Sequence, residues 1–99
     1  MVISIFRSRL RPEHAAEFGI LAAEMKQVAE SMPGFISYTV FASEVDDERC
    51  GIVEFESHEQ LLAWREHSGH VEAQRLGRER YYAEYSLQVC DPVRESRFP

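Results

Sequence analysis

The residues best suited to chemistry gather in the C-terminal half of the chain. The single tryptophan, Trp64, is followed by His67 and His70, and then by Tyr82 and Tyr85. An indole ring can stack on a planar ligand, and an imidazole exchanges a proton near neutral pH. The pattern predicts that a helix here runs into a strand, where a small α+β domain can open a ligand pocket. We therefore take Trp64, His67 and His70 as candidate catalytic residues, the first as a stacking wall and the histidines as bases.

Structural roles remain open for the same three residues. The histidines lie three positions apart, which would put them on one face of an unbroken helix, but Gly69 between them disfavours a continuous helix. With no third ligand in the sequence nearby, we predict no metal site. A histidine at a helix end also interacts with terminal carbonyl groups, and a tryptophan also anchors a small core.

The tyrosines belong to the segment predicted as the last strand. Successive side chains of a strand point to opposite faces, so Tyr81 and Tyr85 are expected to share one face and Tyr82 to take the other. We keep Tyr82 and Tyr85 as candidate substrate-binding residues. Packing between two subunits is the alternative role for the pair that shares a face.

Hydrophobic periodicity predicts four strands and two helical regions. Alternating apolar residues indicate strands, and apolar residues at spacings of three and four indicate helices. The strands are expected at residues 2–10, 35–42, 49–56 and 81–90, and the helical regions at residues 12–31 and, broken near His67–Gly69, up to residue 78.

Residues with known preferences at helix ends mark the boundaries of these regions. Pro12 favours the start of the first helix, and Pro33 with Gly34 ends it. Ser57 and Gln60 match a capping box before the second helical region. Gly77 lies close enough to the end of that region to serve as its cap.

The element order is βαββαβ, an α+β ferredoxin-like arrangement with a four-stranded antiparallel sheet and both helices on one face. All four strands carry apolar residues on both faces, and two helices can cover only one face. We therefore expect a homodimer in which two sheets pack together. Arg7 and Arg9 share a face with Ile3 and Ile5, and we expect them to form ion pairs between subunits.

Composition restricts the classes of partner. The 99 residues suffice for one domain, predicted at 1–91 with a tail at 92–99, and the net charge of -6 disfavours nucleic acid and anionic membranes. No apolar run is long enough to span a bilayer, and the first residues lack the features of a signal peptide. The distant Cys50 and Cys90 are expected to be reduced thiols, which together predict a cytoplasmic protein.

With this architecture, the chain resembles the antibiotic biosynthesis monooxygenase superfamily of dimeric α/β barrels. The resemblance rests on the opening strand with RPEHAAEF, on MPGFISYTV, on FESHEQLLAWREH and on RYYAEYSLQVC. It implies a small dimer that oxidises aromatic or polyketide-like substrates with dioxygen and no bound cofactor. Other members bind or degrade haem or process small signalling molecules, and fold alone does not choose among these activities.

Three positions carry the comparison with that superfamily further. Trp64 falls where characterised oxygenases carry a pocket tryptophan. Phe6 stands where they carry an asparagine, and Gln74 stands where haem-degrading relatives carry a histidine. Phe6 and Gln74 are therefore candidate substrate-binding residues beside Tyr82 and Tyr85.

Two function classes follow from this reading. The first is a cofactor-independent monooxygenase for a small aromatic substrate, with the pocket between the sheet and the helices at residues 61–78. The second is a non-catalytic dimeric module that binds a small molecule or serves a stress response, which the loss of the asparagine favours. Haem binding is a further alternative, with His67 or His70 as the iron ligand.

Overall fold

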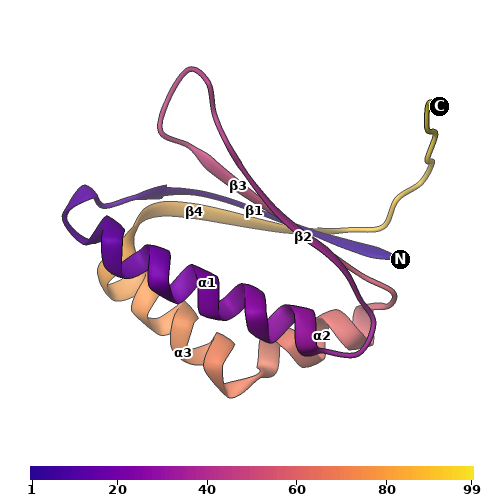
Figure 1. Ribbon diagram of the computed structural model, residues 1–99, viewed down its shortest axis with the longest axis horizontal. Helices are drawn as coiled ribbons and strands as arrows, with labels where there is room; N and C mark the ends of the chain where they lie inside the picture. The colour runs from indigo at the N-terminus through magenta and orange to yellow at the C-terminus, as the bar shows by residue number, and fades with distance from the viewer.

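The computed structural model describes residues 1–99 and places every helix on one side of a four-stranded antiparallel sheet (Figure 1). The strands lie side by side in the order β2-β3-β1-β4. This confirms the predicted ferredoxin-like α+β fold. The strands are β1 (Val2–Leu10), β2 (Phe35–Ala42), β3 (Arg49–Phe55) and β4 (Tyr82–Cys90), and the helices are η1 (Pro12–His14), α1 (Ala15–Ser31), α2 (His58–Glu66), α3 (Ser68–Leu76) and η2 (Gly77–Tyr81).

The first helical region follows its sequence signals closely. Pro12 opens the short 3-10 turn η1, which leads directly into α1. After α1 the chain reverses at Gly34, whose φ of 83° lies in the left-handed region that glycine adopts without strain. Ser57 caps α2 by accepting a hydrogen bond from the Gln60 backbone N–H at 3.2 Å. The Gln60 side chain bonds to the Ser57 hydroxyl rather than to its backbone, so only half of the predicted capping box forms.

The break in the second helical region falls at His67, within the predicted interval His67–Gly69. α2 ends at Glu66 and α3 begins at Ser68, so the interruption is a single residue. His67 makes the junction, because its Nδ1 accepts a hydrogen bond from the Gly69 N–H at 3.1 Å and so caps α3. His67 therefore binds a backbone N–H group at the start of α3. It does not bind a carbonyl group at the end of a helix, which was the alternative role that the sequence left open.

Gly77 does not terminate the helix as predicted. Its φ of -58° is right-handed, and the chain continues through it into η2, a single turn of π-helix. The reason for glycine is space. A Cβ at this position would lie 2.4 Å from the ring of Tyr82, so Gly77 lets that ring pack against the helix backbone.

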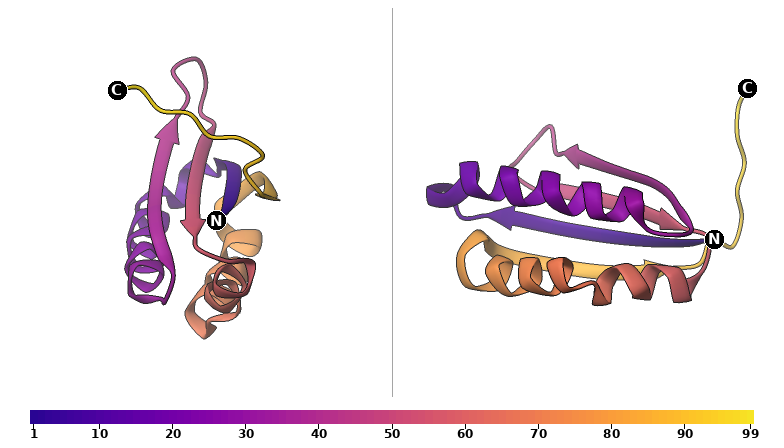
Figure 2. Two further views of the ribbon diagram at one scale, coloured as in Figure 1. Left: turned by 90° about the vertical axis from the view of Figure 1, so that its right-hand side faces the viewer. Right: turned by 60° about the horizontal axis from the view of Figure 1, so that its bottom comes forward.

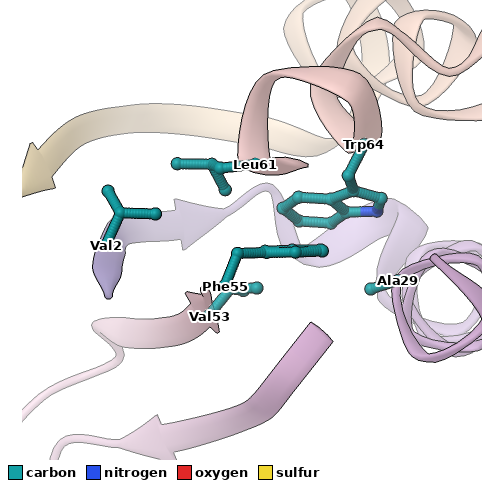
Figure 3. Close-up of a cluster of buried hydrophobic side chains, with 6 residues drawn as sticks. All are labelled: Val2, Ala29, Val53, Phe55, Leu61 and Trp64. Carbon is teal, nitrogen blue, oxygen red and sulfur yellow. The ribbon is translucent and has the colours of Figure 1, made fainter. Parts of the chain in front are cut away.

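The core lies between the sheet and the single layer of helices, at the end of the sheet near α2 (Figure 3). Trp64 from α2 stacks on Phe55 from β3, with ring centroids 5.8 Å apart. Burial of aromatic and branched side chains supplies most of the stability of a domain this small. The buried cluster consists of Val2, Ala29, Val53, Phe55, Leu61 and Trp64.

A β-bulge corrects the predicted distribution of tyrosines. The pairing of β1 with β4 shifts between Arg9 and Leu10, so that Arg9 pairs with Glu84 and Leu10 with Tyr82. The extra residue turns Tyr82 to the same face as Tyr85, toward the helices. The prediction of opposite faces was wrong, because strict alternation does not continue through a bulge.

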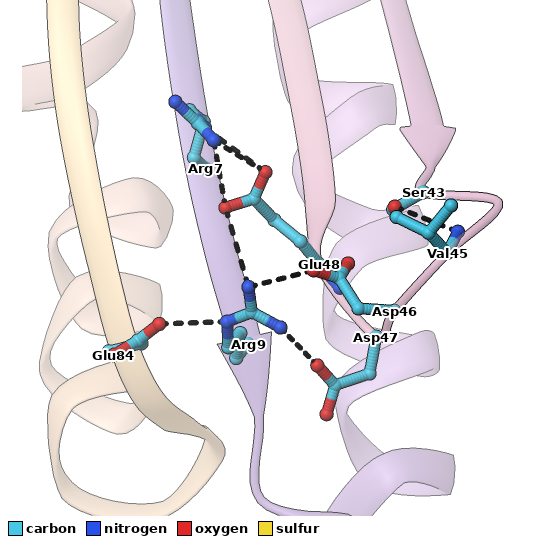
Figure 4. A network of polar contacts seen from close by, with 8 residues as sticks. All are labelled: Arg7, Arg9, Ser43, Val45, Asp46, Asp47, Glu48 and Glu84. Carbon is cyan, nitrogen blue, oxygen red and sulfur yellow. Dashed lines mark hydrogen bonds and ion pairs between the residues drawn. The ribbon is translucent and has the colours of Figure 1, made fainter.

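Arg7 and Arg9 find their partners within the chain, which corrects the expected ion pairs between subunits (Figure 4). Arg7 binds Glu48 at 2.8 Å, and Arg9 binds Glu84 at 2.8 Å. Arg9 also contacts Asp46 and Asp47 in the loop between β2 and β3. The acidic loop thus bends back onto β1 and holds both guanidinium groups on the face away from the helices.

That second face of the sheet is left without a covering layer (Figure 2). Strand pairing places Ile5 opposite Ile52 on this face, and Phe41 beside them is 53% exposed. Residues 91–99 contain no helix or strand, and this segment leaves β4 on the side of the open face. None of the helices combines the length and apolar character needed to cross a lipid bilayer.

Candidate active site

A partly open cavity of about 130 Å³ lies between the sheet and the α2–α3 pair. All four strands and both helices contribute to its wall. An apolar cavity of about 150 Å³ holds a benzene molecule, so this one has room for a single aromatic ring. The lining residues are Ser4, Phe6, Tyr38, Gly51, Val53, Trp64, Arg65, His70, Gln74, Tyr82, Tyr85 and Leu87.

The structure brings six of the seven candidate site residues to this cavity. Trp64 and His70 form the helical side, with Gln74 one turn further along α3. Phe6, Tyr82 and Tyr85 form the sheet side, with ring centroids between 5.2 and 5.5 Å apart. His67 is the exception, because it caps α3 and does not line the cavity.

Trp64 serves the core and the cavity at once. It is only 5% exposed, and its ring packs on Phe55 below and on Tyr38 at 6.0 Å. Its indole Nε1 is the one buried side-chain nitrogen or oxygen that has no hydrogen-bond partner. Trp64 therefore contributes an apolar wall, and the donor group is not needed to hold the ring in place.

His70 is held by two contacts to its Nδ1. The Arg65 carbonyl oxygen lies 3.2 Å away and the side-chain amide of Gln74 lies 3.0 Å away. Since a carbonyl only accepts, the Arg65 contact requires a proton on Nδ1, and the Gln74 Nε2 then lies beside this N–H without forming a hydrogen bond to it. This tautomer leaves Nε2 unprotonated and without a partner in the chain.

Burial keeps this imidazole neutral. The His70 ring lies 4.4 Å from the Trp64 ring between centroids, and the loss of solvent lowers its pKa to about 4. At neutral pH His70 is thus a hydrogen-bond acceptor and a weak base. The sequence predicted that the two histidines exchange protons near pH 7. His70 does not, because its pKa lies well below that pH.

The phenols of Tyr38 and Tyr82 stay protonated for the same reason. Burial raises the pKa of both hydroxyl groups above the usual value. Neither hydroxyl forms a hydrogen bond within the chain, and both residues line the cavity. They offer two O–H donors to whatever occupies the space.

Three arginine and tyrosine residues near the cavity escaped the sequence analysis. Arg65 lines it, and Arg49 lies behind it, with the guanidinium carbon 5.1 Å from the ring centroid of Phe18. Tyr38 joins the wall from β2. A usable signal existed only for Tyr38, whose position in an alternating strand gives its face. Arg49 starts a strand beside an acidic loop, which predicts a surface ion pair instead.

Gly51 shapes the floor of the cavity. It lies opposite Phe6 in the β1–β3 pairing, and a Cβ built on it would meet nothing closer than the Phe6 carbonyl oxygen at 4.0 Å. The missing side chain therefore leaves space that a ring can fill. No group of three or more histidine, cysteine or acidic residues converges anywhere in the chain in a way that would hold a metal ion.

A ferredoxin-like sheet with an aromatic cavity beneath its helices defines a class of small α+β domains, and the comparison with known sequences names the family. The sequence profile described as antibiotic biosynthesis monooxygenase matches residues 1–76. The chain belongs to this family. The expected resemblance is confirmed, and the family supports a monooxygenase without indicating a substrate.

Individual relatives agree with this assignment. The chain is 25% identical over 95 residues to the uncharacterized protein YqjZ of Bacillus subtilis. The aligned residues cover 96% of this chain and 82% of that protein. Rv0793 from Mycobacterium tuberculosis has a similar structure, with a TM-score of 0.85, 20% identity and coverage of 97% of this chain and 98% of that one. The cofactor-independent oxygenase SnoaB from Streptomyces nogalater, solved in a mutant form, has a TM-score of 0.80, 15% identity and coverage of 95% and 94%. At these identities the two structural likenesses establish the fold alone.

Proposed function

We propose that the protein is a cofactor-independent monooxygenase that oxidises a small, electron-rich aromatic hydroxyl compound with dioxygen. The observation that carries the proposal is the cavity itself. It has room for one ring, lies between Phe6 and Trp64, and contains the neutral imidazole of His70. A ligand larger than one ring would extend through the open side.

The proposed reaction begins with removal of the hydroxyl proton. His70 Nε2 accepts this proton, and the aromatic anion transfers one electron to dioxygen to give superoxide and a ligand radical. Their recombination forms a carbon–oxygen bond and a peroxide anion, which takes the proton back from His70. The resulting hydroperoxide loses water as its O–O bond and the C–H bond at the same carbon break, which leaves a quinone. One oxygen atom enters the product and the other leaves in water.

The chain's own residues would orient and desolvate the reactants. Trp64 and Phe6 hold the ring between two apolar surfaces, which excludes water and fixes the orientation of the ring. The Arg65 carbonyl keeps His70 in the tautomer whose Nε2 is free. SnoaB, by its description a cofactor-independent oxygenase on the same fold, supports this chemistry.

Oxygen uptake with hydroxyanthrone and hydroquinone substrates tests the proposal. Gly51→Val should abolish uptake, because its side chain fills the ring space while a β-branched residue favours the strand. His70→Gln should lower the rate by about a hundredfold, the usual range for loss of a general base. His67→Asn is the matched control, since asparagine also caps a helix and His67 lies outside the cavity. Equal rates in the wild type and Gly51→Val would contradict the proposal.

A binding module without catalysis is the second candidate, and Phe6 favours it. A phenyl ring supplies neither donor nor acceptor, and His70 is a weak base. This candidate predicts that an aromatic ligand quenches the fluorescence of Trp64 saturably while no oxygen is consumed. Turnover in the oxygen assay would exclude it.

We also propose that the protein works as a homodimer in the cytoplasm. Support for the dimer comes from the uncovered sheet face with Ile5, Ile52 and Phe41. Support for the compartment comes from Cys50 and Cys90, which are both unpaired thiols.

A further inference from the structure

The wall of the cavity is positive in an otherwise acidic protein. The chain has a net charge of -6, yet no aspartate or glutamate is among the residues that line the cavity. Arg65 lines it directly. The polar groups around the ring space are mainly donors, and such a lining suits a ligand that carries negative charge.

Arg49 is the second positive group, and it has no counter-ion. Arg7, Arg9, Arg75 and Arg80 each form an ion pair with a carboxylate. Arg49, half-buried on the helix side of the sheet, forms neither an ion pair nor a side-chain hydrogen bond in the chain. Its contact with the Phe18 ring compensates only part of the lost hydration.

Tyr38 and Tyr82 connect Arg49 to the cavity. The Arg49 charge acts on both phenols, and both line the ring space with hydroxyl groups that are free to donate. The Tyr82 ring also packs at 5.5 Å on Phe18, the ring that the Arg49 guanidinium contacts. A positive charge behind two O–H donors favours an oxygen anion in front of them.

We propose that the cavity holds its aromatic ligand as an oxyanion, with Tyr38 and Tyr82 donating hydrogen bonds to the ionised oxygen and Arg49 supplying the counter-charge behind them. The inference rests on the proposed function for the use of the cavity, and it narrows the substrate to acidic hydroxyaromatics or enols. The proposal excludes neutral ring compounds of the same shape as substrates.

The weak basicity of His70 points the same way. A buried imidazole with a pKa of about 4 removes a proton from an ordinary phenol only with difficulty. A ligand that ionises readily, or that arrives ionised, needs less from this base. The groups facing the ionised oxygen would be Tyr38 and Tyr82 from the sheet, Arg49 behind them, and Arg65 and His70 from the helices.

The test compares 4-nitrophenol with 4-nitroanisole, which differs from it only by a methyl group on the oxygen. The first ionises near neutral pH and absorbs differently as a phenolate, the second cannot ionise, and neither is electron-rich enough to react with dioxygen. We expect 4-nitrophenol to bind as the phenolate, with its pKa lowered by about one unit, and to bind at least about tenfold more tightly than 4-nitroanisole. Binding of 4-nitrophenol as the neutral phenol, equal affinity for the two probes, or no binding of either would overturn the inference.

Variants then identify the groups responsible. Arg49→Met and Tyr82→Phe should each weaken phenolate binding about tenfold and leave 4-nitroanisole unchanged, and Arg49→Lys should restore much of the loss. Lys26→Met is the control, because it removes one exposed positive charge from α1. Should Arg49→Met fail to fold, Tyr82→Phe still tests the site. Unchanged phenolate binding in Tyr82→Phe and, where it folds, in Arg49→Met would refute the role of these groups.

The outcome is separable from that of the proposed function. Phenolate preference without oxygen uptake would leave an anion-binding module and reject the monooxygenase. Oxygen uptake without phenolate preference would keep the monooxygenase and reject the oxyanion site.

Discussion

His70 is a histidine whose charge state is set by its burial against Trp64. Its pKa of about 4 lies below the 6.5 of a histidine in water. In the unfolded chain the ring takes up a proton as the pH falls below 6.5, whereas in the folded chain it resists until about pH 4. The unfolded state therefore binds more protons in this window, and stability falls as the pH falls.

Replacement of the ring should remove this pH dependence. The free energy of unfolding falls in the wild type as the pH is lowered from 6.5 to 4. In His70→Gln we expect this fall to be smaller, by at most about 3 kcal/mol. Urea titrations across this range measure the difference. His58→Gln, which removes an exposed histidine, should keep the slope. A wild-type curve parallel to that of His70→Gln would show that the ring is not buried in this way.

Two glycines make a matched pair for the packing of Tyr82. Gly77→Ala places a Cβ 2.4 Å from the Tyr82 ring and should destabilise the protein by about 1–3 kcal/mol, as overpacking does. Gly19→Ala in α1 meets no heavy atom within 4 Å and should stabilise it by about 0.5–1 kcal/mol through helix propensity. Thermal unfolding measures both, and a neutral Gly77→Ala would mean that the ring moves without resistance.

At the scale of elements, local signals predicted what local forces decide. The bounds of β1 and β2 agree with alternation, and Ser57 caps α2 as its hydroxyl predicts. The features that the sequence predicted wrongly depend on contacts between residues that are distant in the chain. Gly77 was taken for a helix end because nothing in the neighbouring sequence reveals that the ring of Tyr82 folds back onto it.

The residues of the candidate site also fall into those that the sequence could reveal and those that depend on distant contacts. Trp64 and His70 could be found from their chemistry and helical position. Arg49 could not, because its lack of a carboxylate partner emerges only when the loop acids are seen to bind Arg7 and Arg9. The shared face of Tyr82 and Tyr85 depends on the register between β1 and β4, which no single strand encodes.

The acidic loop between β2 and β3 should depend on Arg9 for its position. Arg9→Gln leaves Asp46, Asp47 and Glu84 without their shared cation, so we expect a lower melting temperature at low salt. The difference should shrink at high salt, because these exposed charges are screened. Arg94→Gln, in the segment after β4, should change nothing. A loss in Arg9→Gln that does not respond to salt would indicate a packing role instead.

At the scale of the whole molecule, the uncovered sheet face predicts association. An interface of more than ~1,200 Å² is typical of stable pairs, and this face offers apolar residues at its centre. We expect sedimentation at micromolar concentration to give about twice the chain mass of 11.5 kDa.

A charge at the centre of that face should separate the pair. Ile5→Glu buries an unpaired carboxylate and should yield monomers, whereas Ile20→Glu, on the 67% exposed position of α1, should not. Monomers in the wild type would contradict the expected packing of sheet on sheet. If Ile5→Glu remained a dimer, the interface would have to lie on another surface of the protein.

The bulge opposite Arg9 and Leu10 also bears on how such a cavity can diverge. If the bulge closed without loss of a residue, Ala83 would pair with Leu10 in strict alternation, and the longer C-terminal part of β4 would keep its pairing with β1. Tyr82 would then rotate to the open face, and the cavity would lose one of its phenols with no substitution in its wall. A change of register at this one position thus offers a way to change ligand preference, and a sequence comparison that scores substitutions alone would overlook it.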